Sequence, residues 1–362
     1  MFDFFKKLGI GNGKNQNEVS QDASLLLTMP SSVMNEVLGK LDFKDILKLR
    51  KVCRDLRIFV DENADFHLYG LKICDFDNEV QLSMSTYGKT DDFCYKNVKN
   101  GCEIVHSDQG IEKKQFVKKG NYLDLVFNDL AVILRLQKSV LELFEVEFNL
   151  YTVSPPEFSS KLHAIMAPRL LKTIRFYTTV SQPSDVMCCL PYLHTASLES
   201  IKIQCTQNIH QLKRNKEKYL DLKEGIAELE QWKGAERLGI YGFLVAKEDL
   251  KHFRHATEID VTLEHVGPQD LMEWKENLLR HAHLQKVTLN YRSIDNENFS
   301  DLFGPIDISN RLNQSPLAKC CFKTSKSEEI IDVSWWATLT FQLERKIFDK
   351  NDNYDFIHEI SV

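Results

Sequence analysis

LFEVEF at residues 143–148 begins a pattern that recurs along the chain as LKTIRF (171–176), LESIKI (198–203), AERLGI (235–240), ATEIDV (256–261) and LQKVTL (284–289). In each segment the fourth and sixth residues are apolar, and a mostly polar residue lies between them. This alternation is typical of a β-strand with one buried face. The repetition therefore predicts six strands that share one core.

The spacing of these strands indicates how they are connected. Their fourth residues are 28, 27, 37, 21 and 28 positions apart. Helical patterns fill most of the gaps, such as the face formed by Leu271, Trp274 and Leu278. One strand–helix unit cannot bury its apolar face alone, whereas stacked neighbours can. The spacing favours an irregular leucine-rich-repeat-like array. The alternative is an ordinary α/β domain with a parallel sheet.

The rest of the chain divides around this array. Residues 1–24 are rich in Gly, Asn, Gln and Lys and are expected to form a disordered tail. Residues 25–65 carry helical patterns, and short alternating runs over 66–121, broken by turn residues, predict β-hairpins. A helix over 122–139 opens the array, which is expected to extend to residue 310. Residues 311–362 are expected to add C-terminal strands that cap it. The expected fold class is α+β or α/β.

The most specific local signal is the stretch MPSSVMNEVLGKLDFKDILKLRKVCRDLR at 29–57. Pro30 suits the first turn of a helix, and Asp42 can cap the next one. Ile46, Leu49, Cys53 and Leu56 form one apolar stripe, which Leu47 and Val52 widen. A fragment of this size cannot bury so wide an arc, so the surplus must contact the rest of the chain or a partner.

This stretch resembles an F-box. The family pattern runs Leu-Pro, apolar pairs, Leu, Asp-Leu-Leu, Arg, Val-Cys-Arg and an aromatic residue. The counterparts in this sequence are Met29 and Pro30, Val33, Val37 and Leu38, Leu41, Asp45 to Leu47, Arg50, and Val52 to Arg54. Two positions depart from the pattern, because Met29 replaces leucine and Leu56 stands where many members have tryptophan.

The remainder resembles the FTH domain of the nematode-expanded F-box A class. The strings that carry this resemblance are NGCEIVH (100–106), YLDLVFNDLAVILRLQKSVLELFEVEF (122–148), LPYLHTASLESIKI (190–203), LEQWKGAERLGI (229–240) and DLMEWKENLLRHAHLQKVTL (270–289). The two resemblances together cover about residues 25–292.

The resemblance implies a role in ubiquitination. F-box proteins are substrate receptors of SCF-type cullin–RING ubiquitin ligases, in which the F-box binds the Skp adaptor and, through it, cullin. The C-terminal domain binds a protein substrate and contributes proximity without performing chemistry. By this resemblance the adaptor-facing residues are Met29, Pro30, Val33, Val37, Leu41, Leu47 and Val52, although the Ile46 stripe could instead be internal core. The alternative function is a non-catalytic protein-binding scaffold without ligase activity.

The composition agrees with a protein-binding role. The net charge of -6, from 46 basic and 52 acidic residues in 362, argues against nucleic acid as a partner. No apolar run is long enough for a membrane span, and the nine cysteines show no disulfide framework spacing, so the cytoplasm or nucleus is the expected location. Adjacent cysteines and scattered histidines lack metal-ligand spacing, and no catalytic motif is found. We therefore expect no enzyme activity and no cofactor.

Overall fold

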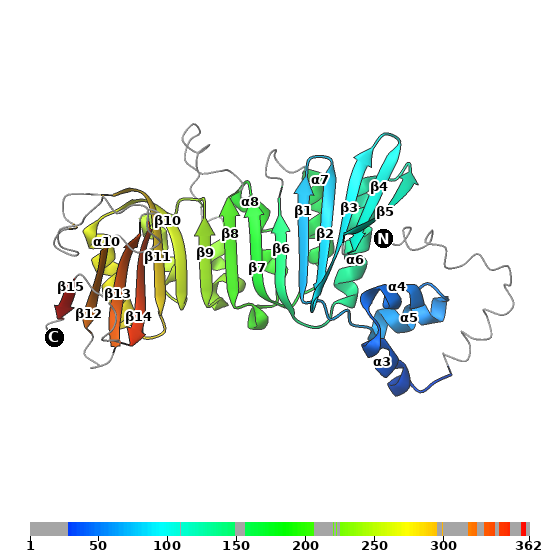
Figure 1. Cartoon of the computed structure of the whole chain (residues 1–362), viewed down its shortest axis with the longest axis horizontal. Helices are drawn as coiled ribbons and strands as arrows, with labels where there is room; N and C mark the ends of the chain where they lie inside the picture. Colours follow the sequence, from blue (N-terminus) through cyan, green and yellow to red (C-terminus); the bar gives the residue numbers. More distant parts are fainter. Residues whose placement is uncertain are drawn as a thin grey trace. The chain divides into compact units, whose positions relative to one another are not determined.

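The computed structural model describes residues 28–108, 110–148, 156–205, 220, 222, 225–294, 299, 318–323, 329–336, 340–347 and 356–359. The chain forms two compact units, shown in Figure 1. Unit 1 comprises residues 1–177 and 188–197, and unit 2 comprises residues 178–187 and 198–362. The tail expected over 1–24 lies outside the described residues.

Within the described residues, unit 1 begins with three short helices, α3 (Ser31–Lys40), α4 (Phe43–Leu49) and α5 (Arg54–Asn63). Five strands follow: β1 (Gly70–Phe76), β2 (Glu79–Thr86), β3 (Lys89–Val98), β4 (Gly101–Asp108) and β5 (Ile111–Lys118). The unit continues with α6 (Tyr122–Leu136), β6 (Leu141–Glu147), α7 (Pro156–Met166) and β7 (Thr173–Val180), whose last residues belong to unit 2. It also contains the short turns η1 (Leu190–Tyr192) and η2 (Thr195–Ser197).

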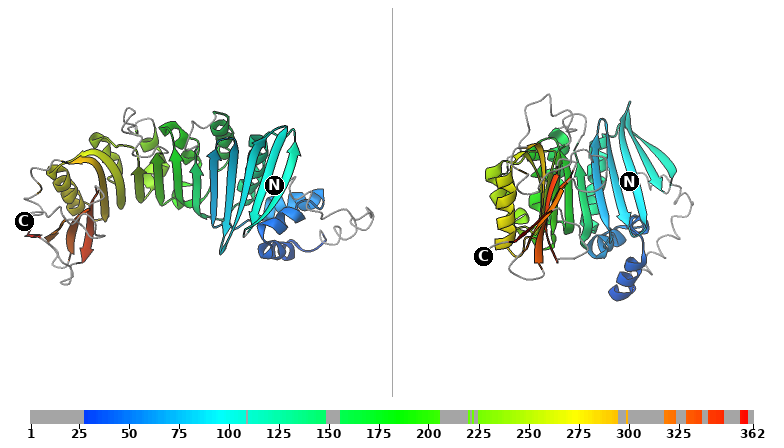
Figure 2. Two further views of the ribbon diagram at one scale, coloured as in Figure 1. Left: turned by 45° about the horizontal axis from the view of Figure 1, so that its top comes forward. Right: turned by 60° about the vertical axis from the view of Figure 1, so that its left-hand side comes forward.

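Strands β1 to β5 form the antiparallel meander that residues 66–121 predict. Strand β1 also pairs in parallel with β6, and β7 follows β6 in the sheet. Helix α6 packs on one face of strands β2–β4 (Figure 2). Its Asp129 accepts a buried hydrogen bond of 2.5 Å from the Tyr95 hydroxyl of β3. Gly101 begins β4 where a Cβ atom would overlap the carbonyl oxygen of Val117, so the close approach of β5 requires glycine.

Unit 2 holds α8 (Pro183–Val186), β8 (Ser200–Cys205), η4 (Ile226–Glu228), α9 (Glu230–Gly234), β9 (Arg237–Tyr241), η5 (Lys247–Phe253), β10 (Glu258–Val266), α10 (Pro268–Arg280) and β11 (Lys286–Ile294). The C-terminal strands are β12 (Ala318–Lys323), β13 (Glu329–Trp336), β14 (Thr340–Ile347) and β15 (Phe356–Glu359). The sheet of this unit has the order β15-β12-β13-β14-β11-β10-β9-β8. Strands β8–β11 are parallel, and β14, β13 and β12 continue the sheet antiparallel.

The repeated six-residue pattern fixes the register of unit 2. Ile201 lies directly opposite Leu238, Leu238 opposite Ile259, and Ile259 opposite Val287. All four side chains are buried. The row continues into the antiparallel strands, where Leu343 lies opposite Val287. Equivalent repeat positions therefore form one continuous apolar row through the core of this unit.

The predicted α+β class is confirmed, because helices precede a mixed sheet that carries further helices. All six repeat segments contain a strand. One repeat position differs from the others, since Ile174 of β7 is only half-buried and Phe176 of the same strand is fully buried. Ile226 and Trp232, which have helical spacing in the sequence, lie in the separate short elements η4 and α9.

Candidate functional site: the N-terminal helices

Local sequence explains where the three N-terminal helices begin. Pro30 precedes α3, and its carbonyl oxygen accepts the first helical hydrogen bonds. The Asp42 carboxylate caps α4 by accepting a 2.8 Å hydrogen bond from the Asp45 N–H. The Cys53 thiol caps α5 in the same way, accepting from the Leu56 N–H at 3.4 Å. The Val-Cys-Arg motif thus supplies the start of the third helix.

The helices share a small apolar core. Its buried members are Met34, Leu38, Phe43, Ile46, Leu47, Leu56 and Val60. At its edge the Arg50 guanidinium donates to the Asp61 carboxylate at 2.5 and 2.9 Å. Burial raises the pKa of Asp61, but the bonds and charge of Arg50 outweigh it and hold that pKa below 3.8. This pair joins the end of α4 to α5.

Most of the residues predicted to face an adaptor are accessible. Met29 and Val33 are each 44% exposed, Val52 is 47% exposed, and Pro30 is also exposed. Val37 and Leu41 are partly exposed. Leu47 is only 1% exposed and belongs to the core with Ile46, so it is not available to a partner in this structure. Sequence reasoning missed Ile58, which is 47% exposed and lies off the Ile46 stripe.

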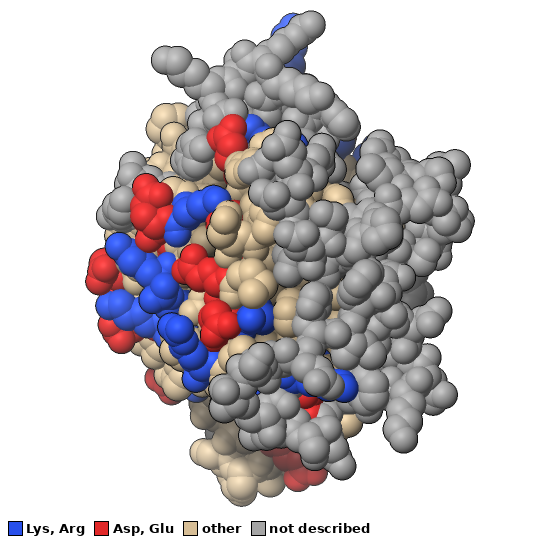
Figure 3. All heavy atoms as spheres, turned by 90° about the vertical axis from the view of Figure 1, so that its left-hand side faces the viewer, with Lys and Arg blue, Asp and Glu red and all other residues tan. Residues whose placement is uncertain are grey.

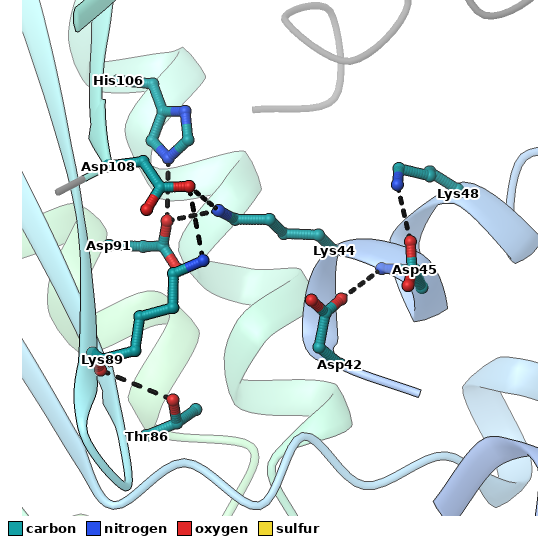
Figure 4. Close-up of polar contacts among 9 residues, drawn as sticks. All are labelled: Asp42, Lys44, Asp45, Lys48, Thr86, Lys89, Asp91, His106 and Asp108. Carbon is teal, nitrogen blue, oxygen red and sulfur yellow. Dashed lines mark hydrogen bonds and ion pairs between the residues drawn. The ribbon is translucent and has the colours of Figure 1, made fainter. Parts of the chain in front are cut away.

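An ion-pair cluster attaches α4 to the sheet, as Figure 4 shows. Asp91 of β3 and Asp108 of β4 are cross-strand partners. Two like charges in this position destabilise a sheet unless a cation lies between them. Lys44 of α4 supplies that cation, with its Nζ 2.5 Å from Asp91 and 2.8 Å from Asp108. Lys89 adds a second ammonium 3.3 Å from Asp108. We call Asp91 and Asp108 the acidic pair.

His106 completes this cluster from within the sheet. It is buried, stacks on Phe93 with ring centroids 4.3 Å apart, and its Nε2 lies 2.9 Å from Asp91. Because the carboxylate accepts, Nε2 carries the proton. Ligand atoms of His106 and the acidic pair lie within 4.8 Å of one another, a spacing that could suit a metal ion. The Lys44 ammonium already contacts both carboxylates, so it provides the positive charge there.

The charges of this cluster stabilise one another. Burial raises the pKa of Asp91, but hydrogen bonds from His106 and Lys44 outweigh it and place that pKa below 3.8. Burial lowers the pKa of Lys44, but its bonds to Asp108 and Asp91 place it above 10.5. Each group is therefore held in its charged form, and the contact between α4 and the sheet is ionic at neutral pH.

A second set of contacts attaches α5 to the end of α6. Arg135 of α6 lies 3.4 Å from Asp61, and the Lys138 ammonium donates to the carbonyl of Glu62. Asp65, just after α5, accepts from the Lys138 N–H and the Ser139 hydroxyl, each at 3.1 Å. The N-terminal helices are thus fixed to the body of unit 1 at two separate places.

A groove of about 670 Å³ runs along this junction. It lies between α4 and strands β4 and β5. Its lining residues are Leu41, Lys44, Asp45, Lys48, Leu49, Lys51, Val52, His106, Asp108 and Lys113. Two residues predicted to face an adaptor, Leu41 and Val52, therefore share a surface with the sheet.

Several other cysteine, tryptophan and histidine side chains are buried or make hydrogen bonds within the fold. All nine cysteines are free thiols, and Cys320 and Cys321 are buried in unit 2. Trp335 is buried and donates to the Tyr291 hydroxyl at 2.7 Å, whereas Trp336 is half-buried. His255 and His283 each contact a backbone carbonyl. No described helix combines the length and apolar character needed to cross a membrane.

Comparison with known proteins identifies these regions. The F-box domain model matches residues 26–67, and the FTH domain model matches residues 156–306. The chain is also similar to F-box A protein 224 of Caenorhabditis elegans, with 30% identity over 158 residues. That match covers 41% of this chain and 38% of the relative, so it spans well under half of the relative's length. No solved structure matches the chain. The chain therefore carries an N-terminal match to the F-box domain followed by a match to the FTH domain.

Proposed function

We propose that this protein is a substrate-recognition subunit of an SCF-type ubiquitin ligase. In this proposal the F-box binds a Skp-family adaptor, which links it to cullin, and the FTH domain binds a protein substrate. The protein itself performs no chemistry and acts by holding the substrate near the ubiquitin-charged enzyme. Its place of action would be the cytoplasm, the nucleus or both.

The observation that carries the proposal is the set of exposed apolar side chains on the matched F-box. Met29, Val33 and Val52 remain about half-exposed although the helices have a complete core of their own. Apolar side chains in such a position favour a protein partner. The proposed adaptor contacts are Met29, Pro30, Val33, Val37, Leu41 and Val52, without the buried Leu47.

The finer architecture belongs to the same proposal. We infer that the parallel strands and their connecting helices form a leucine-rich-repeat-like array. Support comes from the recurrence of the strand pattern and from the register that aligns Ile201, Leu238 and Ile259. Arrays of this kind bind partners through variable exposed side chains, which suits a substrate-binding role.

The test is co-purification of the full chain with a Skp-family adaptor and cullin. Pro30→Ala combined with Leu41→Ala is expected to abolish adaptor binding and leave the melting temperature of the chain within a few degrees. Tyr87→Ala combined with Ile111→Ala is the matched control, because both residues are exposed on the sheet of unit 1. Full adaptor recovery by the folded Pro30/Leu41 variant would contradict the proposal.

A second pair of variants separates surface from core within the F-box. Val52→Asp is expected to lose adaptor binding while the chain stays folded, because Val52 is exposed. Leu47→Asp is expected to unfold the N-terminal helices, because it places a charge in their core. A stable stoichiometric partner recovered without adaptor or cullin would instead support a scaffold without ligase function.

A further inference from the structure

A second pocket lies on unit 1, away from the cluster around Lys44. Its volume is about 370 Å³, and it lies where the end of α6 meets the turn between α7 and β7. Its lining residues are Leu134, Arg135, Gln137, Lys138, Ile165, Met166, Arg169, Leu170, Leu171 and Lys172. Four of these residues are basic and none is acidic. We call this the basic pocket.

The basic side chains of the pocket are only partly neutralised. Arg135 contacts Asp61, and Lys138 bonds to the Glu62 carbonyl, so these two are held in place by α5. Within the part of the chain that the structure describes, no carboxylate pairs with Arg169 or Lys172. The Arg135 Nε is also buried without a hydrogen-bond partner among the described residues. The pocket therefore has spare capacity to bind negative charge.

The pKa of Arg169 agrees with this excess of positive charge. Burial lowers its pKa, and the positive charge of Arg135 lowers it further. No neighbouring carboxylate offsets either effect. An anion placed between the two guanidinium groups would relieve their repulsion and could accept hydrogen bonds from both.

The apolar side chains of the pocket indicate a second property of its ligand. Leu134 and Leu171 are buried beneath it, and Leu170 is 61% exposed at its rim. Leu170 thus offers an apolar contact beside the cations Arg169 and Lys172. A ligand that fits the pocket thus combines negative charge with an apolar side chain.

Helix dipoles account for part of this basic charge. Basic residues in the last turn of a helix stabilise it by interacting with the helix dipole. This explains Arg135, which lies in the last turn of α6. Lys172 lies beyond the end of α7 at Met166, outside the turn on which the dipole acts. The charge of the pocket therefore exceeds what the two helix ends require.

One other face of the molecule offers a contrast in its charge. On the face that Figure 3 shows, basic and acidic side chains lie beside one another. Ion pairs such as Lys247 with Asp270, 2.7 Å apart, balance charge on α10 of unit 2. The basic pocket differs from this face, because none of its lining residues is acidic.

We propose that the basic pocket binds an acidic peptide segment of a substrate, with its negative side chains on Arg169 and Lys172 and an apolar side chain against Leu170. This inference extends the proposed function. It depends on the proposed function only in identifying the bound peptide as part of a substrate. The negative charge could come from carboxylates or from phosphorylated side chains, since both suit guanidinium donors.

Peptide binding to the full chain tests the proposal. The probes are fluorescein-labelled peptides of the composition Gly-Glu-Glu-Leu-Glu-Glu-Gly, a version with phosphoserine beside the leucine, and a version with glutamine in place of every glutamate. The carboxylate peptide, the phosphorylated peptide or both should bind, and the glutamine peptide should bind at least about tenfold more weakly. Comparison of the first two identifies the preferred source of charge. Failure of both acidic peptides to bind below about 1 mM would overturn the proposal.

Two variants link binding to the pocket. Arg169→Gln combined with Lys172→Gln should weaken binding of the acidic peptide by about tenfold or more. Lys113→Gln combined with Lys114→Gln is the matched control, because it removes the same charge from the exposed edge strand β5, and it should change affinity by less than about twofold. Equal affinities in the two variants would overturn the assignment of the site. Adaptor binding is measured on the same proteins, and its retention by the Arg169/Lys172 variant separates this proposal from the F-box proposal.

Discussion

The carboxylates of Asp91 and Asp108 lie on directly opposed residues of neighbouring strands. In isolation this arrangement would strain the hairpin of β3 and β4, because like charges face each other. The Lys44 ammonium of the F-box contacts both carboxylates. Lys44 therefore contributes both to the charge balance of the sheet and to the attachment of the F-box to it.

Lys44→Met should destabilise unit 1. The change leaves Asp91, whose side chain is almost fully buried, without its closest cation, at a cost of about 1–3 kcal/mol. Lys48→Met, on the same helix, removes an exposed pair with Asp45 and should cost less than about 0.5 kcal/mol. Urea unfolding of both variants measures the difference. Equal midpoints would show that the acidic pair needs no cation from α4.

The contribution of Asp91 should depend on pH in a definite direction. Its pKa in the folded chain lies below the ordinary value of 3.8, so its stabilising effect is present above 3.8 and is lost as pH falls through the folded value. The pKa of Lys44 is raised above 10.5, so its effect is lost only as pH rises through that higher value. The difference in unfolding free energy between the natural chain and Asp91→Asn should be constant between about pH 5 and pH 9 and shrink below pH 3.8. A difference that grows on acidification would exclude the ionic interpretation.

The cysteine of the Val-Cys-Arg motif should act as a helix cap. Cys53→Ala removes the acceptor for the Leu56 N–H and should destabilise the F-box by about 0.5–1 kcal/mol. Cys53→Ser restores an acceptor and should be at least as stable as the natural chain. Thermal unfolding followed by circular dichroism compares the three proteins. A serine variant no more stable than the alanine variant would rule out the capping role.

The apolar row of unit 2 should be sensitive to single truncations. Leu238→Ala removes a buried side chain from between Ile201 and Ile259 and should cost about 2–5 kcal/mol. Ile347→Ala is the control, because Ile347 is 74% exposed at the end of β14, and it should cost less than about 0.5 kcal/mol. The midpoint of chemical unfolding reports both values. Similar losses in the two variants would mean that the repeat row does not form the core.

Local patterns in the sequence predicted the strands but did not predict how deeply every strand residue is buried. The period-two alternation around Ile201 and Val287 is a local property, and both residues are buried as expected. Ile174 has the same local pattern, yet neighbouring packing leaves it half-buried while Phe176 fills the core. Periodicity shows which side chains share a face and does not show how completely that face is covered.

The site was only partly predictable for a related reason. Helical spacing places Leu47 and Val52 on the same widened arc, but only tertiary packing separates them, since Leu47 is buried and Val52 exposed. The contact between Lys44 and Asp108 joins residues 64 positions apart, so no local pattern could reveal it. The turn at Asn100, with its positive φ of 71°, lies within the β3–β4 hairpin whose register brings Asp91 opposite Asp108.

In the proposed ligase, the two attachments of the F-box would have a consequence for ubiquitin transfer. A flexible tether would spread a bound peptide over a large volume and dilute it near the transferring enzyme. Here α4 is held through Lys44 and α5 through Asp61, both within unit 1. A peptide in the basic pocket, which borders Arg135, would therefore keep a nearly constant separation from the adaptor-binding side chains. The effective concentration of its lysines would be set by where they lie along the substrate, and small shifts in that position would decide which of them is modified.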